Sequence, residues 1–195
     1  MKAIMISIKP KRVAKILNGE KTIEIRKKFP KDYIGWVYIY CTKGDKNTCL
    51  EYADNPDKNK EGKWCVTSGY PYANGKVVAR FWCNKVEEIK FINPNRTCGF
   101  SCEISDDDCY YNINENECCL SQDDLYDYLQ GKNGKAIYIT KLEIFDKPKE
   151  ISEFYRIIKT DIRYCIADIE KQKPITLDAC KKITKAPQSW CYIEV

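Results

Sequence analysis

The first 42 residues constrain the fold most, because their apolar residues change from an alternating pattern to a helical one and back again. Residues 3–9 alternate, with Ile4, Ile6 and Ile8 on one face, which is typical of a half-buried strand. Pro10 suits the first turn of a helix. That helix would bury an apolar face made of Val13, Ala14, Ile16 and Leu17.

The helix is predicted to end at Asn18-Gly19, which suits a left-handed cap. Residues 22–27 alternate again, and residues 35–42 form an apolar and aromatic run typical of a strand buried on both sides. A strand, a helix and two further strands suit a small β-barrel whose ends are closed by one or two helices.

The rest of the chain continues this pattern between polar segments. Further predicted elements are strands over 76–83, 86–92, 136–145 and 189–194, a helix from Ser121 to Gly131, and a loop or short helix over 148–154. Polar insertions are predicted at about 43–75, with a short strand over 62–67, at 92–119, and at 159–185, which is partly helical by composition. We therefore expect an α+β fold in a single domain over 1–195, a small β-barrel with a few flanking helices and long loop insertions.

The absence of histidine excludes several kinds of catalytic site. Neither a Ser-His-Asp triad nor a Cys-His pair can form, so proton transfer would use Lys, Glu, Asp, Tyr or Cys. The sequence also has no P-loop and no G-x-G-x-x-G motif. It contains neither an apolar run near 18 residues nor a signal-peptide pattern, so we expect a cytoplasmic protein without a membrane span.

The chain is rich in cysteine, with 12 residues, and without a secretion signal we read most of them as reduced thiols. Five cluster in sequence: Cys98, Cys102, Cys109, Cys118 and Cys119. A four-thiolate zinc site usually has two tight C-x-x-C knuckles, and this segment has none. Free thiols are favoured over structural zinc, and we expect neither a metal nor another cofactor.

Charge is concentrated in two segments of opposite sign. Residues 1–31 hold ten Lys or Arg and two Glu, a net charge of +8, whereas residues 97–131 hold nine acids and no Lys or Arg. A basic segment suits a polyanion such as RNA, DNA or a nucleotide. The alternative is a solvated surface on which the acidic segment folds as a counterweight.

One short motif, G-x-K-x-x-E-x-R, combines Gly19, Lys21, Glu24 and Arg26 at the turn from helix to strand. Alternate strand residues share a face, so Glu24 and Arg26 would project together, about 6.6 Å apart. A lysine, a carboxylate and a guanidinium in one cleft could bind a phosphate or a base edge, or perform acid–base chemistry. The alternative is that Glu24 and Arg26 form ordinary surface ion pairs.

This motif resembles the hallmark of ASCH domains, which belong to the PUA-like superfamily. The strand and helix before it lie where that family has them, and residues 142–148 and 186–192 are similar to segments of phage- and Firmicutes-associated ASCH proteins. The resemblance implies a PUA-like (ASCH) pseudobarrel whose cleft binds RNA or a nucleotide-like ligand.

The resemblance also implies site residues. Lys21, Glu24 and Arg26 match the motif and would line the cleft, joined by Ser7 and Lys9 from the first strand. Some superfamily members are similar to amidohydrolases of acylated cytidines, which pair the motif lysine with a threonine where this chain has Glu24. Thr22 is the nearest hydroxyl on the same strand face.

A second departure is Arg80, where similar proteins often carry an acid. Other ASCH members resemble ribonucleases, for which Lys21 with Glu24 or a tyrosine would suffice. The leading hypothesis is thus a protein that binds RNA, other nucleic acid or a nucleotide in the motif cleft. The alternatives are a hydrolase of a modified nucleoside or RNA with Lys21 and Glu24 catalytic, and a phage-related factor that binds a protein partner through the acidic segment 97–131 or covers its own cleft with it.

Overall fold

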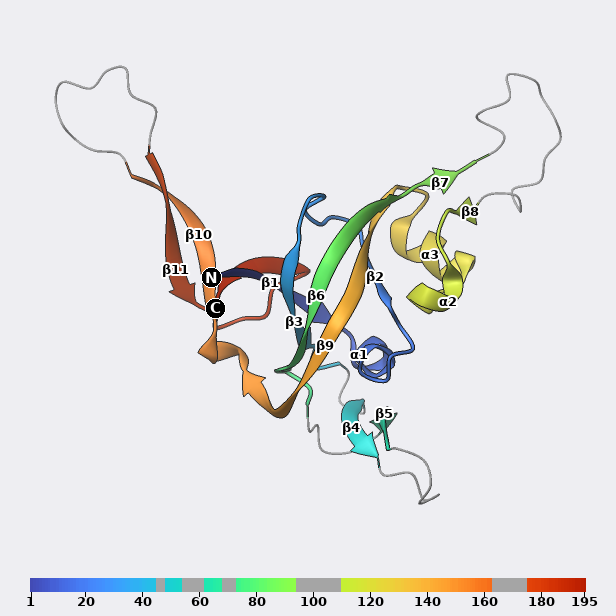
Figure 1. Cartoon of the computed structure of the whole chain (residues 1–195), viewed down its shortest axis with the longest axis horizontal. Coiled ribbons are helices and arrows are strands. Elements are labelled where there is room, and N and C mark those ends of the chain that lie inside the picture. The colour runs from blue at the N-terminus through green and yellow to red at the C-terminus, as the bar shows by residue number, and fades with distance from the viewer. Residues whose placement is uncertain (45–47, 54–61, 68–72, 94–109, 163–174) are drawn as a thin grey trace.

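The computed structural model describes residues 1–44, 48–53, 62–67, 73–93, 110–162 and 175–195 (Figure 1). Within these residues, eight strands form one sheet in the order β11-β10-β12-β1-β3-β6-β9-β2. The strands are β1 (Lys2–Ile8), β2 (Ile23–Arg26), β3 (Gly35–Cys41), β6 (Lys76–Ile89), β9 (Gly134–Glu150), β10 (Tyr155–Ile162), β11 (Ile175–Lys182) and β12 (Trp190–Glu194). β1 and β3 run parallel, because α1 (Pro10–Leu17) and β2 separate them in the chain.

The sheet curls so that β2, at one end of the strand order, returns to β1. Between them in that order lie β3, β6 and β9. The Nη2 of Arg26 on β2 nevertheless donates a hydrogen bond of 2.7 Å to the carbonyl of Ser7 on β1. The expected barrel-like fold with few helices is confirmed, and a side chain spans the gap between these two described strands.

The helix predicted from Pro10 is confirmed as α1. Its apolar face packs on Ile4, Ile6 and Ile8 of β1 in the main core. Asn18 follows as the C-cap, and Gly19 has a φ of +72°, the left-handed backbone that glycine adopts without steric cost. The chain can therefore reverse directly before Lys21.

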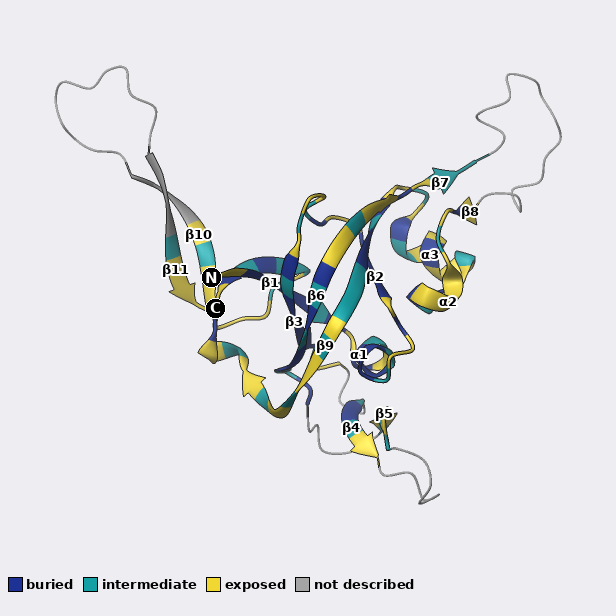
Figure 2. Cartoon of the chain, viewed as in Figure 1, coloured by how far each residue is buried: buried dark blue, intermediate teal, exposed yellow. Residues whose placement is uncertain are grey.

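The prediction that the first strand is half-buried is wrong. Ala3 and Met5, on the face opposite the isoleucines, are also buried, in a second core with Tyr38 and Ile193. Each face of β1 therefore packs in a core of its own, the isoleucines in the main core and Ala3 and Met5 in the second. The prediction of burial on both sides of the third strand is confirmed in β3. Figure 2 shows this concentration of buried residues in the central strands.

The two strands predicted over 76–83 and 86–92 are instead one long strand, β6, followed by the short β7 (Phe91–Ile92). Register shifts between Cys83 and Val86 let β6 bend without ending. β9 likewise continues through Pro148, where a loop or short helix was predicted. Pro148 lies where the ladder to β6 shifts register, which is a position that tolerates a missing N–H. The short helix itself follows as η3 (Ile151–Glu153).

Two predicted insertions contain hairpins. The short strand over 62–67 is confirmed as β5 (Lys63–Thr67), which pairs with an unpredicted strand, β4 (Cys49–Ala53). The prediction of partly helical structure over 159–185 is wrong for its described residues, because β10 and β11 form an antiparallel hairpin. This hairpin extends away from the main body of the sheet (Figure 1).

The acidic segment contributes β8 (Tyr110–Tyr111), α2 (Glu115–Cys118) and α3 (Gln122–Leu129). The predicted N-cap of α3 is confirmed, since Ser121 and Asp124 form a capping box. Leu125 and Leu129 pack on Ile23 and Ile25, so α3 covers one face of β2. Among the helices of the described residues, none has the length and apolar character that a membrane crossing needs.

Candidate functional site

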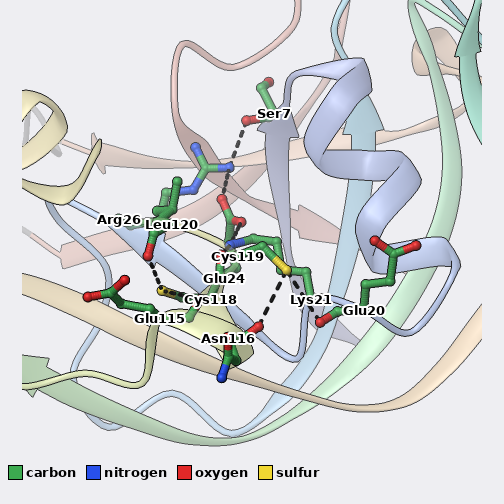
Figure 3. A network of polar contacts seen from close by, with 10 residues as sticks. All are labelled: Ser7, Glu20, Lys21, Glu24, Arg26, Glu115, Asn116, Cys118, Cys119 and Leu120. Atoms are coloured by element: carbon green, nitrogen blue, oxygen red, sulfur yellow. Dashed lines mark hydrogen bonds and ion pairs between the residues drawn. The ribbon is translucent and has the colours of Figure 1, made fainter. Parts of the chain in front are cut away.

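The motif residues form a buried cluster of three charges. The Glu24 carboxylate lies between two cations, with Oε1 at 3.0 Å from Arg26 Nη2 and Oε2 at 3.5 Å from Lys21 Nζ (Figure 3). Lys21, Glu24 and Arg26 are only 1%, 3% and 7% exposed. The alternative that they are ordinary surface ion pairs is therefore wrong.

The burial follows from the position of β2 in the sheet. Ile23 and Ile25 face the apolar cluster under α3, so Glu24 and Arg26 turn to the opposite face of the strand. On that face the guanidinium reaches the Ser7 carbonyl of β1. Both faces of β2 are thus buried. Its polar face lies toward β1, and Glu24 and Arg26 pair with each other there.

α2 covers the lysine of this cluster. Lys21 Nζ donates to the Cys118 carbonyl at 2.5 Å, and the backbone N–H of Thr22 donates to the Glu117 carbonyl at 2.9 Å. Cys119 Sγ donates to the Glu20 carbonyl at 3.4 Å. Burial lowers the pKa of Lys21 from its ordinary value, and the Glu24 carboxylate opposes that shift.

Two polar atoms of the cluster have no hydrogen-bond partner within the described residues. They are Glu24 Oε2, whose approach to Lys21 lacks hydrogen-bond geometry, and Arg26 Nε. Buried polar groups are nearly always paired, so an acceptor and a donor left side by side are unusual.

A cleft of about 790 Å³ adjoins this cluster, and we call it the basic cleft. Its described lining residues are Ser7, Ile8, Lys9, Arg12, Glu24, Ile25, Arg26, Lys27, Lys28, Thr42, Tyr128, Gln188, Ser189 and Trp190. Five of these carry a positive charge and one, Glu24, carries a negative charge. This is the imbalance that an anionic ligand would neutralise.

Aromatic side chains lie among these cations. The ring of Tyr128 has Lys27 Nζ at 5.4 Å and the Arg12 guanidinium at 6.0 Å from its centroid. Trp190 donates from its indole Nε1 to the Lys28 carbonyl at 2.8 Å, which fixes the ring at the cleft wall. The N-terminus of α1 also lies here, through Lys9 and Arg12, and its first turn holds no acidic residue.

The structure brings together four of the six predicted ligand-binding residues: Ser7, Lys9, Glu24 and Arg26 line the basic cleft. Lys21 lies behind Glu24 under α2 and is not among the lining residues, and Thr22 is exposed outside them. The Ser7 hydroxyl donates to the Pro187 carbonyl at 2.6 Å, so it is already engaged.

Sequence reasoning did not assign the other ten described lining residues to the site, among them Arg12, Lys27, Lys28, Tyr128 and Trp190. Arg12 belonged to the basic segment that was recognised, but no sequence signal connects Tyr128 or Trp190 to it. Arg80, the second departure from the family pattern, is not among the lining residues. It pairs with Glu143 at 2.7 Å and lies over the Trp36 ring at 4.1 Å.

Only part of the cysteine cluster lies in the described residues. Cys118 is buried and Cys119 is half-buried, both as free thiols, whereas Cys98, Cys102 and Cys109 lie outside the described residues. Burial raises the pKa of the Cys118 thiol. Across the described ranges, no group of three or more Cys, Asp or Glu is placed to hold a metal ion.

No protein-family model matches the sequence, and no curated protein matches it. Solved structures do match: the crystal structure of ASCH from Zymomonas mobilis has a TM-score of 0.46 and 16% identity, covering 76% of this chain and 73% of that one. A single-residue variant of the same protein matches with the same score and identity, covering 77% of each chain. The chain is thus similar in structure to an ASCH protein at low sequence identity.

Proposed function

We propose that the protein binds RNA, another nucleic acid or a nucleotide-like ligand in the basic cleft. The observation that carries this proposal is the lining of that cleft, with five cationic side chains against one carboxylate. Phosphate contacts supply most of the affinity of proteins for nucleic acids, through release of condensed counterions. A volume of about 790 Å³ lies in the range of small-molecule sites and is large enough for a nucleotide unit.

Different parts of the cleft suit different parts of a nucleotide. Lys27 and Lys28 are exposed at its rim, where phosphates could reach them without displacing buried groups. Tyr128 and Trp190 offer ring faces for base stacking, which is how proteins commonly hold unpaired bases. This combination favours a single-stranded ligand over a duplex, whose bases are not available for stacking.

The test is fluorescence anisotropy with a labelled single-stranded RNA, a duplex RNA and a single-stranded DNA, each at several salt concentrations. The test variant is Lys27→Ala with Lys28→Ala, and the matched control is Lys31→Ala, which removes a lysine that is 79% exposed and is not among the lining residues. Loss of two phosphate contacts should flatten the salt dependence for single strands by about 1.4 in log–log slope. An unchanged slope, or an equal change in the control, would contradict the proposal.

A hydrolase acting on the same ligand is the second candidate, favoured by the lowered pKa of Lys21 and its contact with Glu24. A lysine whose pKa is lowered by burial is a candidate general base. Because Lys21 lies behind Glu24, this function requires substrate to reach past that carboxylate or α2 to move. Product formation that is lost in Lys21→Met, with ligand binding retained, would establish the hydrolase; no product from RNA or from modified nucleosides would reject it.

A further inference from the structure

A second cavity, of about 580 Å³, has a character opposite to that of the basic cleft. It lies between the β4–β5 hairpin and the far half of β9, and its described lining residues are Glu51, Tyr52, Trp64, Ile144, Phe145 and Asp146. The two cavities share no described lining residue. Of the six described lining residues of this second cavity, three are aromatic, two are acidic and none is basic. The chain as a whole has more Lys and Arg than Asp and Glu.

Tyr52 and Trp64 form two walls of this cavity. They face each other across the β4–β5 ladder, with ring centroids 5.6 Å apart and ring planes at 71°. Asn18 fixes the Trp64 backbone with two hydrogen bonds: its Nδ2 donates to the Trp64 carbonyl, and its Oδ1 accepts from the Trp64 N–H. Tyr52 remains 53% exposed, which leaves part of its ring open to a ligand.

The acids give this aromatic corner a negative charge. Glu51 has a fixed orientation, because its Oε2 accepts from the Thr67 hydroxyl at 2.9 Å and its Oε1 from Cys49 Sγ at 3.4 Å. Its partners show that the Glu51 side chain lies on the face of β4 opposite Tyr52, so it adds negative charge near the cavity without facing the two rings. Asp146 is exposed at the opposite side of the cavity, on β9.

The third aromatic residue already interacts with a cation of the chain itself. Lys149 Nζ lies 4.8 Å from the centroid of the Phe145 ring. Aromatic faces attract cations through the negative charge of their π-systems. Tyr52 and Trp64 are the pair that remains for a ligand.

We propose that this cavity binds a compact organic ammonium cation, with Tyr52 and Trp64 against its alkyl groups, Asp146 facing its charge and Glu51 adding negative charge from the opposite face of β4. A phosphate or another anion would be repelled by the two acids, and a bare metal ion would lack ligands on the aromatic side. The proposal is independent of nucleotide binding, because it uses none of the described residues of the basic cleft.

The test compares choline with 3,3-dimethylbutan-1-ol, which has the same shape without the charge. Binding is followed through the indole N–H resonances of the ¹⁵N-labelled full chain, with the Trp64 resonance assigned by Trp64→Phe. We expect choline to shift the Trp64 resonance in a saturable way and the neutral alcohol to bind at least about fivefold more weakly. If a trimethyl-lysine peptide binds more tightly than choline, the natural ligand is a protein side chain. If the peptide binds equally or more weakly, the natural ligand is a free small molecule.

Tyr52→Ala should weaken choline binding at least about fivefold. The matched control is Tyr126→Ala, which removes a tyrosine exposed to a similar extent, 54%, that is not among the cavity's described lining residues. The proposal is overturned if choline does not shift Trp64, if the neutral alcohol binds equally well, or if the control weakens binding as much as Tyr52→Ala. RNA affinity measured on the same variants keeps this test separate from that of the basic cleft.

Discussion

Replacing the buried carboxylate of the motif, Glu24→Gln, should strongly destabilise the protein. The substitution keeps the side-chain shape but removes the only negative charge between Lys21 and Arg26 within the described cluster. Both cations would then be buried, with the carbonyls of Cys118 and Ser7 as their remaining described partners. The loss of one partner from a buried ion pair typically costs about 3–5 kcal/mol, because the other charge is left uncompensated.

The lower end of this range applies, since glutamine can still accept a hydrogen bond from Arg26. A loss of about 3 kcal/mol with a urea m-value of about 2 kcal/mol/M corresponds to a fall of about 1.5 M in the unfolding midpoint. The total stability of a domain is about 5–15 kcal/mol, so the variant would lose a large share of it.

The cost should also depend on pH in a defined direction. Burial lowers the pKa of Lys21 in the folded chain below its ordinary value of 10.5, which applies to the unfolded chain. At a pH between the folded and the unfolded pKa, the unfolded chain therefore binds a proton that the folded chain does not. Stability from this group therefore rises with pH across that window. Glu24 raises the pKa of Lys21, so its removal widens the window toward lower pH. The stability difference between Glu24→Gln and wild type should therefore shrink as the pH rises toward the ordinary pKa of lysine.

The assay is urea unfolding followed by circular dichroism at pH 7 and pH 9. The matched control is Glu88→Gln, which removes the same charge from a pair with Lys135 at 3.2 Å in which Glu88 is 46% exposed. That exposed pair should contribute no more than about 1 kcal/mol. If Glu24→Gln unfolds at the same midpoint as Glu88→Gln, with the same dependence on pH, the buried charge cluster does not have the energetic role described here.

Three further predictions concern other parts of the fold. Ser121→Ala removes the N-cap of α3 and should cost about 1 kcal/mol in urea unfolding, and a loss below about 0.3 kcal/mol would contradict the capping box. Phe81→Ala, at a fully buried site in the main core, should cost about 3–5 kcal/mol by the same assay, and a loss below about 1 kcal/mol would argue against that packing. In a short iodoacetamide pulse followed by mass spectrometry, half-buried Cys119 should be alkylated before Cys118, whose thiol is buried and has a raised pKa; equal labelling would argue against that burial.

Local patterns in the sequence predicted α1 and α3 but not the short α2. α1 follows from Pro10, from its 3.6-residue periodicity and from the turn at Gly19, and the start of α3 follows from Ser121. These signals depend only on neighbouring residues. The pairing of β10 with β11 depends on contacts across 12 intervening residues or more, and composition alone could not reveal it. The continuity of β6 was missed because the polar residues Asn84 and Lys85 interrupt its apolar pattern at the point where the ladder shifts register.

The same distinction applies to the candidate site. The motif predicted that Glu24 and Arg26 share a face, because that follows from strand geometry. It could not predict that the Cys118 carbonyl, 97 positions away from Lys21 in the chain, covers the lysine. Tyr128 and Trp190 likewise reach the basic cleft through the tertiary fold, so periodicity alone placed them only in a helix and a strand.

The most direct test of the proposed function is photo-crosslinking of single-stranded RNA containing 4-thiouridine, with the adducts mapped by mass spectrometry. Binding in the basic cleft predicts adducts on the aromatic residues Tyr128 or Trp190, and their loss when unlabelled RNA competes. Adducts confined to other surfaces, such as the β10–β11 hairpin, would contradict the proposal that the basic cleft is the nucleic-acid site.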